Sequence, residues 1–123
     1  MILADTSVWI DHLRKGDKIL VGLLEKGGVA MHPMIVGELA CGSLRDRSIL
    51  LRLWRNLPAL AAVDDEAALA FIEAKKLMGK GIGFVDVHLL AAVAAEPGAR
   101  LWTRDKRLAR VAELLKLGLE QKA

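Results

Sequence analysis

Three carboxylic acids stand alone in otherwise uncharged stretches of the sequence. Asp5 is the only charged residue among the first ten, Glu38 the only one between positions 27 and 44, and Asp86 the only one between positions 81 and 95. An ionised carboxylate in apolar surroundings is destabilising by several kcal/mol unless a partner or a metal ion compensates its charge. We therefore expect each of these acids to have such a partner.

A fourth acid, Asp105, joins them through its predicted position. Asp5 follows the apolar run 2–4, Asp105 follows the run 100–103, and each acid then opens a predicted helix. If the two runs are parallel strands, their carboxyl ends lie at the same edge of a sheet. Asp86 opens a predicted helix as well.

Four carboxylates at one edge would repel one another unless a divalent cation lay among them. Oxygen ligands favour Mg²⁺ or Mn²⁺, and magnesium typically takes one or two carboxylates directly and keeps several waters. The open positions can accept a phosphate and an attacking water. The hypothesis is therefore a metal-dependent phosphodiesterase site formed by the four acids, which are Asp5, Glu38, Asp86 and Asp105.

Simpler interpretations exist for each acid. Asp5 and Asp105 are good helix N-caps, and Glu38 or Asp86 could be a buried acid that accepts hydrogen bonds from backbone amides. The polar neighbours are equally ambiguous, because they could orient a carboxylate or a metal-bound water, or serve only as caps and turn residues. These neighbours are Thr6, Ser7 and Thr103.

The other chemically capable side chains show no such pattern. His12, His32 and His88 are widely separated and lack metal-ligand spacing, so we expect satisfied or exposed histidines. The single cysteine, Cys41, excludes an intrachain disulfide and a cysteine-based zinc site, and a reducing cytoplasm fits best.

Short strands alternate with helices along the chain, which predicts an α/β fold with three α/β/α layers and a short parallel sheet. We expect one domain over residues 1–123. The predicted strands span 2–4, 29–31, 61–63 and 100–103. The predicted helices span about 5–14, 17–26, 33–42, 50–57, 64–78, 85–95 and 105–115.

The composition is that of a globular protein, with 54% hydrophobic and 27% charged residues, and it excludes disordered and collagen-like classes. We expect neither a signal peptide nor a membrane span. The net charge of +3 permits a polyanionic partner. Basic residues cluster at 45–55 and 100–110. Each cluster is interpreted either as a solvated helix face or as a phosphate-contacting surface.

Four segments, spread in this order over nearly the whole chain, resemble those of PIN-domain ribonucleases, specifically VapC-type toxins. They are DTSVWID from Asp5, GELACG from Gly37, DVHLLAA from Asp86 and LWTRDK from Leu101. The resemblance implies a metal-dependent endoribonuclease of a type II toxin-antitoxin system, inhibited by a VapB-type antitoxin, and a homodimer. It also matches Asp5, Glu38 and Asp86 to the family's three principal acids, and Asp105 to the more variable fourth.

The sequence departs from the family pattern at His88, Leu90 and Leu108, where members more often have an aliphatic, a small and an aromatic residue. None of these changes removes a proposed metal ligand. One alternative hypothesis is a non-catalytic RNA-binding or protein-interaction module on the same fold. Another, a phosphoacceptor signalling domain, fits poorly because it needs paired acids after the first strand and Asp5 stands there alone.

Overall fold

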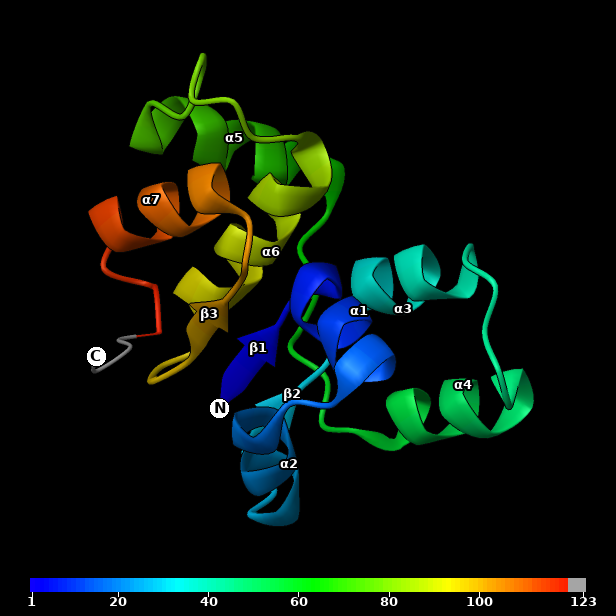
Figure 1. Ribbon diagram of the computed structural model, residues 1–123. Helices are drawn as coiled ribbons and strands as arrows, with labels where there is room; N and C mark the ends of the chain where they lie inside the picture. The colour runs from blue at the N-terminus through cyan, green and yellow to red at the C-terminus, as the bar shows by residue number, and fades with distance from the viewer. Residues whose placement is uncertain (120–123) are drawn as a thin grey trace.

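The structure, a computed structural model, describes residues 1–119 (Figure 1). Its strands are β1 (Ile2–Ala4), β2 (Val29–Ala30) and β3 (Arg100–Trp102). Its helices are α1 (Thr6–Lys15), α2 (Lys18–Glu25), α3 (Pro33–Ala40), α4 (Arg47–Asn56), α5 (Asp65–Lys75), α6 (Phe84–Ala95) and α7 (Lys106–Leu114).

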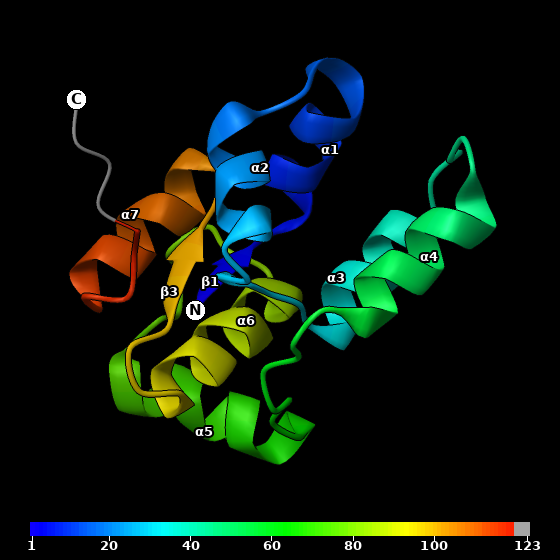
Figure 2. The ribbon, with the colours of Figure 1, turned by 90° about the horizontal axis from the view of Figure 1, so that it is seen from below.

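The three strands form one parallel sheet in the order β2-β1-β3. Figure 2 shows this sheet between two groups of helices, with α5 and α6 on one side and α1, α2 and α7 on the other. Helices α3 and α4 lie beyond the β2 edge. The predicted three-layer α/β/α arrangement is therefore confirmed.

Aspartate side chains start four of the helices. Asp5, Asp17, Asp64 and Asp105 each accept a hydrogen bond from the backbone amide three residues further on. Such caps satisfy amides that have no partner within the helix. The helix starts predicted at these residues are confirmed, and this capping places Asp5 and Asp105 directly behind β1 and β3.

Helix α6 forms the centre of the core. Residues 87–93 of this helix are all buried, which fits a helix that is apolar on every side. Leu3 and Ala4 of β1 and Leu101 of β3 pack in the same core. Within residues 1–119, no helix has both the length and the apolar character needed to cross a membrane.

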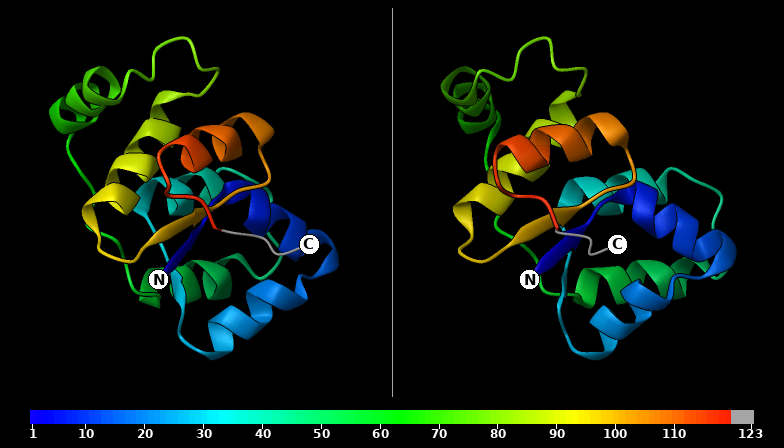
Figure 3. Two further views of the ribbon diagram at one scale, coloured as in Figure 1. Left: turned by 90° about the vertical axis from the view of Figure 1, so that its left-hand side faces the viewer. Right: turned by 60° about the vertical axis from the view of Figure 1, so that its left-hand side comes forward.

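The last described residues, 117–119, pair with the edge of β3 that faces away from β1. The backbone amide of Leu101 donates to Leu117, and the amide of Leu119 donates to Leu101. Figure 3 shows this segment returning beside β3 after α7. It covers part of the strand edge that β3 would otherwise expose.

The predicted strand at 61–63 is wrong. The chain instead reaches the β2 side of the sheet earlier, where Met31 donates to Pro58 and accepts from Leu60 in a single parallel bridge. Residues 61–63 then run along the surface toward α5. The apolar run was too short to separate a strand from a loop beside the sheet.

Helix α5 also ends earlier than the predicted residue 78. Lys76 adopts the left-handed conformation with φ 55°, and the helix terminates there. A left-handed residue is a common helix terminator, although glycine is the usual choice. Residues 77–83 form the connection that leads to Asp86.

Candidate active site

The parallel register brings Asp5 and residues 103–105 to one edge of the sheet. Ala4 lies opposite Trp102, and the backbone amide of Asp5 donates to the carbonyl oxygen of Trp102 at 3.0 Å. The residues that follow β1 and β3 are therefore direct neighbours, as the sequence predicted.

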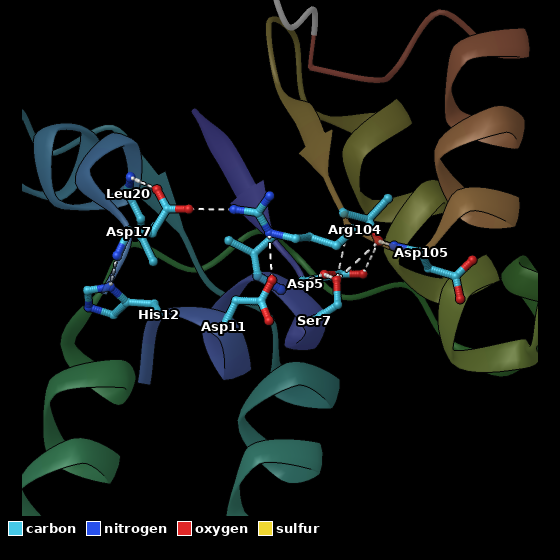
Figure 4. Close-up of polar contacts among 10 residues, drawn as sticks. Asp5, Ser7, Asp11, His12, Asp17, Leu20, Arg104 and Asp105 are labelled. Atoms are coloured by element: carbon cyan, nitrogen blue, oxygen red, sulfur yellow. Dashed lines mark hydrogen bonds and ion pairs between the residues drawn. The ribbon is translucent and has the colours of Figure 1, made fainter. Parts of the chain in front are cut away.

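The Asp5 carboxylate accepts hydrogen bonds at both oxygens (Figure 4). The Ser7 hydroxyl donates to Oδ1 and the Thr103 hydroxyl donates to Oδ2, each at 2.5 Å. The amide of Val8 donates to Oδ1 at 3.3 Å as the helix cap. Asp5 is thus an N-cap whose second oxygen is held by a residue from a different strand end.

Burial raises the pKa of Asp5 above its ordinary value, although the hydrogen bonds that it accepts act in the opposite direction. The residue is only 6% exposed. Its charge is therefore incompletely compensated by the protein, which leaves a demand for a nearby positive group.

Asp86 lies in the first turn of α6, where its Oδ2 atom accepts from the amide of Gly83 at 3.0 Å. Burial raises the pKa of Asp86, and the negative charges of the other three acids raise it further. This mutual repulsion places Asp86 within electrostatic reach of Asp105, Asp5 and Glu38. The four acids, separated by up to 100 residues in the chain, share one region of the fold.

Glu38 and Asp105 differ from the other two because their side chains are exposed. The Thr6 hydroxyl donates to Oε1 of Glu38 at 2.6 Å, and Oδ1 of Asp105 caps α7 by accepting from Leu108 at 3.0 Å. The uncharged stretch around Glu38 predicted a carboxylate drawn into apolar surroundings, and that prediction is wrong. Its neighbours on α3 pack against the core while Glu38 itself faces outward.

The four acids can serve a metal ion in an open arrangement. Among residues 1–119, no three His, Cys, Asp or Glu side chains converge closely enough to form a metal site by themselves. Mg²⁺ and Mn²⁺ fit the donor set, because every donor is a carboxylate oxygen and because magnesium usually retains several of its waters. The mutual repulsion at Asp86 is the feature that such a cation would relieve.

Ser7 and Thr103 also organise the loop after β3. The Ser7 hydroxyl oxygen accepts from the amide of Arg104 at 2.9 Å, and the Thr103 hydroxyl oxygen accepts from the amide of Asp105 at 3.1 Å. Each hydroxyl therefore links this loop to the Asp5 carboxylate. The sequence left open whether these residues orient a carboxylate or act as turn residues, and Ser7 and Thr103 do both.

Arg104 belongs to an ion-pair network and not to a free basic surface. Its Nε atom lies 2.9 Å from Asp11, and its Nη2 atom pairs with Asp17. Figure 4 shows the side chain extending toward these two acids and away from Asp105. The phosphate-contacting interpretation of the basic cluster at 100–110 therefore does not extend to Arg104.

Arg107, two residues after Asp105, lies beside the connection from α5 to α6. Its side chain lies over Gly81, where an added Cβ atom would come within 2.9 Å of the Arg107 Cδ atom. Gly81 has φ +80°, a backbone conformation that favours glycine. Within the described residues Arg107 forms no ion pair.

Each histidine makes one local hydrogen bond, but the expectation of satisfied or exposed histidines is wrong for His32 and His88, which are buried and each keep one ring nitrogen without a partner within residues 1–119. Nδ1 of His12 accepts from the amide of Asp17, and Nδ1 of His32 accepts from the amide of Met34, each at 3.0 Å. Nε2 of His88 lies 2.9 Å from Oδ1 of Asp65. The sequence contained no signal for this last contact, because it joins the first residue of α5 to the second turn of α6.

Comparisons with known proteins identify the family of this chain. The profile of the PIN domain family matches residues 2–114. The chain is 48% identical over 108 residues to Ribonuclease VapC32 of Mycobacterium tuberculosis, covering 88% of this chain and 87% of the relative. It is 34% identical over 116 residues to Ribonuclease VapC11 of the same organism, covering 85% and 87%.

A solved structure has the same fold. The crystal structure of PAE2754 from Pyrobaculum aerophilum aligns with a TM-score of 0.64, and the alignment covers 96% of this chain and 87% of that one. At 16% sequence identity this likeness concerns the fold alone.

Proposed function

The chain belongs to the PIN-domain family, among its VapC-type ribonucleases, and from this premise we propose that it is a metal-dependent endoribonuclease. The reaction is hydrolysis of RNA phosphodiester bonds, and the catalytic set is the four acids. The observation that carries the proposal is the placement of the acids: Asp5 and residues 103–105 are neighbours after β1 and β3, and Asp86 lies near enough to the other three acids for their charges to raise its pKa. A protein with a net charge of +3 has concentrated negative charge at this one edge.

The chain's own residues would perform three tasks. Asp5 and Asp86 would hold Mg²⁺ or Mn²⁺, with Glu38 and Asp105 binding it directly or through water. The ion, when bound, supplies polarisation of the phosphate and a lowered pKa of an attacking water. Ser7 and Thr103 would keep the Asp5 oxygens fixed, because hydrogen bonds to ligand carboxylates orient them.

The test is RNA cleavage by the purified chain, freed of any copurifying partner, in Mg²⁺, Mn²⁺ or EDTA. We expect cleavage in either metal ion, none in EDTA, and none by Asp86→Asn. Cleavage at the wild-type rate in EDTA or by the variant would contradict the proposal. Metal-independent RNA binding without cleavage, by folded protein and across a broad RNA panel, would favour the non-catalytic module instead.

We also infer a role as the toxin of a type II system, with a VapB-type antitoxin and a second copy of this chain as partners. Large apolar side chains that remain exposed support this inference, in particular Ile19 at 62%, Leu53 at 58% and Ile49 at 53%. Light scattering should give twice the chain mass of 13.4 kDa. A monomer that stays soluble at high concentration would contradict the homodimer.

A further inference from the structure

A pocket of about 440 Å³ lies between α3 and α6, and its lining includes Glu38, one of the four acids. Its wall on one side is the α3 face that carries Pro33 and Gly37, and its other walls are Val63, Val85 and the ring of His88. Figure 2 shows the connection from α4 to α5, which contains Val63, passing close to these two helices. Three separate segments of the chain therefore build this pocket.

The pocket is continuous with the acidic site. Glu38 lines the pocket and is also one of the acids that repel Asp86. Val85, on the opposite wall, directly precedes Asp86. A chain molecule with a phosphate at the acids would therefore have its adjoining unit at the mouth of the pocket.

The walls suit a flat apolar ligand. Pro33, Met34, Val63 and Val85 present aliphatic or thioether surface. Thioether sulfur and aliphatic groups pack well against aromatic rings. At Gly37 no heavy atom lies within 4 Å of the position that a Cβ would occupy, so space remains beside the helix.

Two buried ring nitrogens among the lining residues lack a partner. His32 and His88 are 1% and 2% exposed, and Nε2 of His32 and Nδ1 of His88 make no hydrogen bond within residues 1–119. Buried polar atoms are normally satisfied, so each needs an explanation. Both residues line the pocket.

The two nitrogens have complementary roles. Nδ1 of His32 accepts from an amide, so in the neutral ring Nε2 carries the hydrogen and is a donor. Nε2 of His88 faces the Asp65 carboxylate, so that nitrogen carries the hydrogen and Nδ1 is an acceptor. One donor and one acceptor, both buried, thus lie directly behind the apolar walls of the pocket.

We propose that this pocket takes one nucleobase of the RNA, next to the phosphate that is cleaved. The proposal rests on the ribonuclease function proposed above and names a specificity determinant for it. A base has two apolar faces and an edge that presents donors and acceptors side by side, and single-stranded RNA can turn such a base outward. A small shift of the histidine rings, or a water carried with the base, connects that edge to the two nitrogens.

A peptide side chain is the competing occupant, and it matches the pocket less well. An aliphatic or phenyl side chain would fill the apolar walls but leave both histidine nitrogens without partners. A basic side chain would pair with Glu38 but offers no acceptor for the His32 donor. The observations therefore favour the base.

The first test blocks the pocket without any substitution. Cys41 is the only cysteine, is exposed and lines the pocket. Wild-type protein is treated with a small methylthio reagent or with a bulky maleimide, and Cys41→Ser treated in the same way is the control. Cleavage of an RNA library with random sequence is then mapped by sequencing the ends.

The second test fills the pocket from α3 with Gly37→Leu. Its matched control is Gly22→Leu, because Gly22 lies inside α2 and also has open space where a Cβ would stand. For the preferred RNA, we expect kcat/KM to fall by about ten- to a hundredfold in Gly37→Leu and in the maleimide adduct, with loss of sequence preference at one position beside the cut. Gly22→Leu should cut as wild type, and the small adduct should reduce cleavage less than the maleimide adduct does.

An abasic nucleotide at that position separates pocket loss from general damage. Wild type should lose the same factor on abasic RNA, and Gly37→Leu should lose nothing further. The pocket proposal is wrong, and the nuclease stands, if wild type cuts but every variant keeps its sequence preference. It is also wrong if, on abasic RNA, Gly37→Leu remains as impaired relative to wild type as it is on the preferred RNA. If the pocket variants cut RNA as wild type does but are no longer inhibited by a protein partner, the pocket binds a peptide of that partner. No metal-dependent cutting by wild type would reject the nuclease, and the pocket proposal with it.

Discussion

The two sides of the site treat their polar atoms differently. On the side formed after β1 and β3, the Asp5 carboxylate accepts three hydrogen bonds and Arg104 is held by two acids. On the side formed by α3 and α6, Glu38 is exposed, and two buried histidine nitrogens have no partner among residues 1–119. The first side is already organised, as metal binding requires. The second side has hydrogen-bonding groups that the described residues leave unused, as recognition of a substrate that varies in sequence requires.

The largest expected effect comes from Asp5 and Asp86, the two acids whose pKa is raised by burial. Asp5→Asn and Asp86→Asn should abolish RNA cleavage, because each removes a negative charge from the metal ligands. Both variants should fold, and Asp86→Asn should be at least as stable as wild type, because it relieves repulsion from the other three acids. Gel-based cleavage assays and thermal unfolding measure the two effects. A strongly destabilised Asp86→Asn would mean that the charge has a structural role.

The exposed acids should matter less at high metal concentration. Glu38→Gln and Asp105→Asn should lose about ten- to a hundredfold in kcat/KM at low Mg²⁺, as expected for ligands that act through water. Raising Mg²⁺ should restore part of this activity, whereas it should restore none in Asp5→Asn. Equal rescue of all variants would remove the distinction between buried and exposed acids.

The hydroxyl neighbours of the acids provide a matched pair. Ser7→Ala should cost about tenfold in cleavage, because a buried carboxylate loses a hydrogen bond that water cannot replace. Thr6→Val should cost less, because Glu38 is exposed and water can substitute for the hydroxyl. The comparison is made at matched Mg²⁺, and a larger loss in Thr6→Val would reverse the assignment.

Two arginines near the site should separate RNA binding from stability. The plot of log(kcat/KM) against log salt has a negative slope. Arg107→Ala should make this slope less steep by about 0.7, the value for one phosphate contact to single-stranded RNA. Arg104→Ala should leave that slope unchanged and instead lower the midpoint of thermal unfolding, because its charge is paired with Asp11 and Asp17. An unchanged slope in Arg107→Ala would place the RNA backbone elsewhere.

The smallest expected effect concerns pH. Burial lowers the pKa of His32, and the neighbouring His88, itself bonded to Asp65, lowers it further. As the pH falls below 6.5, His32 binds a proton in the unfolded chain but not yet in the folded chain. The free energy of unfolding should therefore decrease by at most about 1.4 kcal/mol per pH unit. Chemical denaturation across pH 5–8 measures this slope.

His32→Asn is the control for that slope. Asparagine retains an oxygen that can accept from the amide of Met34 as a helix cap, but it does not titrate in this range. The variant should therefore show a shallower decrease of stability on acidification. A slope identical to that of wild type would mean that other groups cause the acid sensitivity.

The sequence predicted the elements of the fold wherever a local rule was sufficient. Aspartate caps marked the starts of α1, α2, α5 and α7, and short apolar runs marked all three strands. The run at 61–63 failed because its three apolar residues fit a loop as well as a strand. Local signals fix caps and periods, whereas strand pairing depends on the rest of the chain.

The site was less predictable, for a physical reason. An isolated acid predicted a partner correctly for Asp5 but predicted burial incorrectly for Glu38. The ion pair between Arg104 and Asp17 spans 87 residues, and no spacing rule could show it. The pocket beside α3 is built from three segments, so its shape appears only in the folded chain.

The most direct test of the account is the location of bound Mn²⁺ on the protein. Paramagnetic broadening of backbone amide signals should be strongest for the residues after β1, in the first turn of α6 and after β3, and it should disappear in Asp86→Asn. The same broadening in the variant, or no localised broadening in a wild-type protein that cleaves RNA, would contradict a metal site built on the four acids.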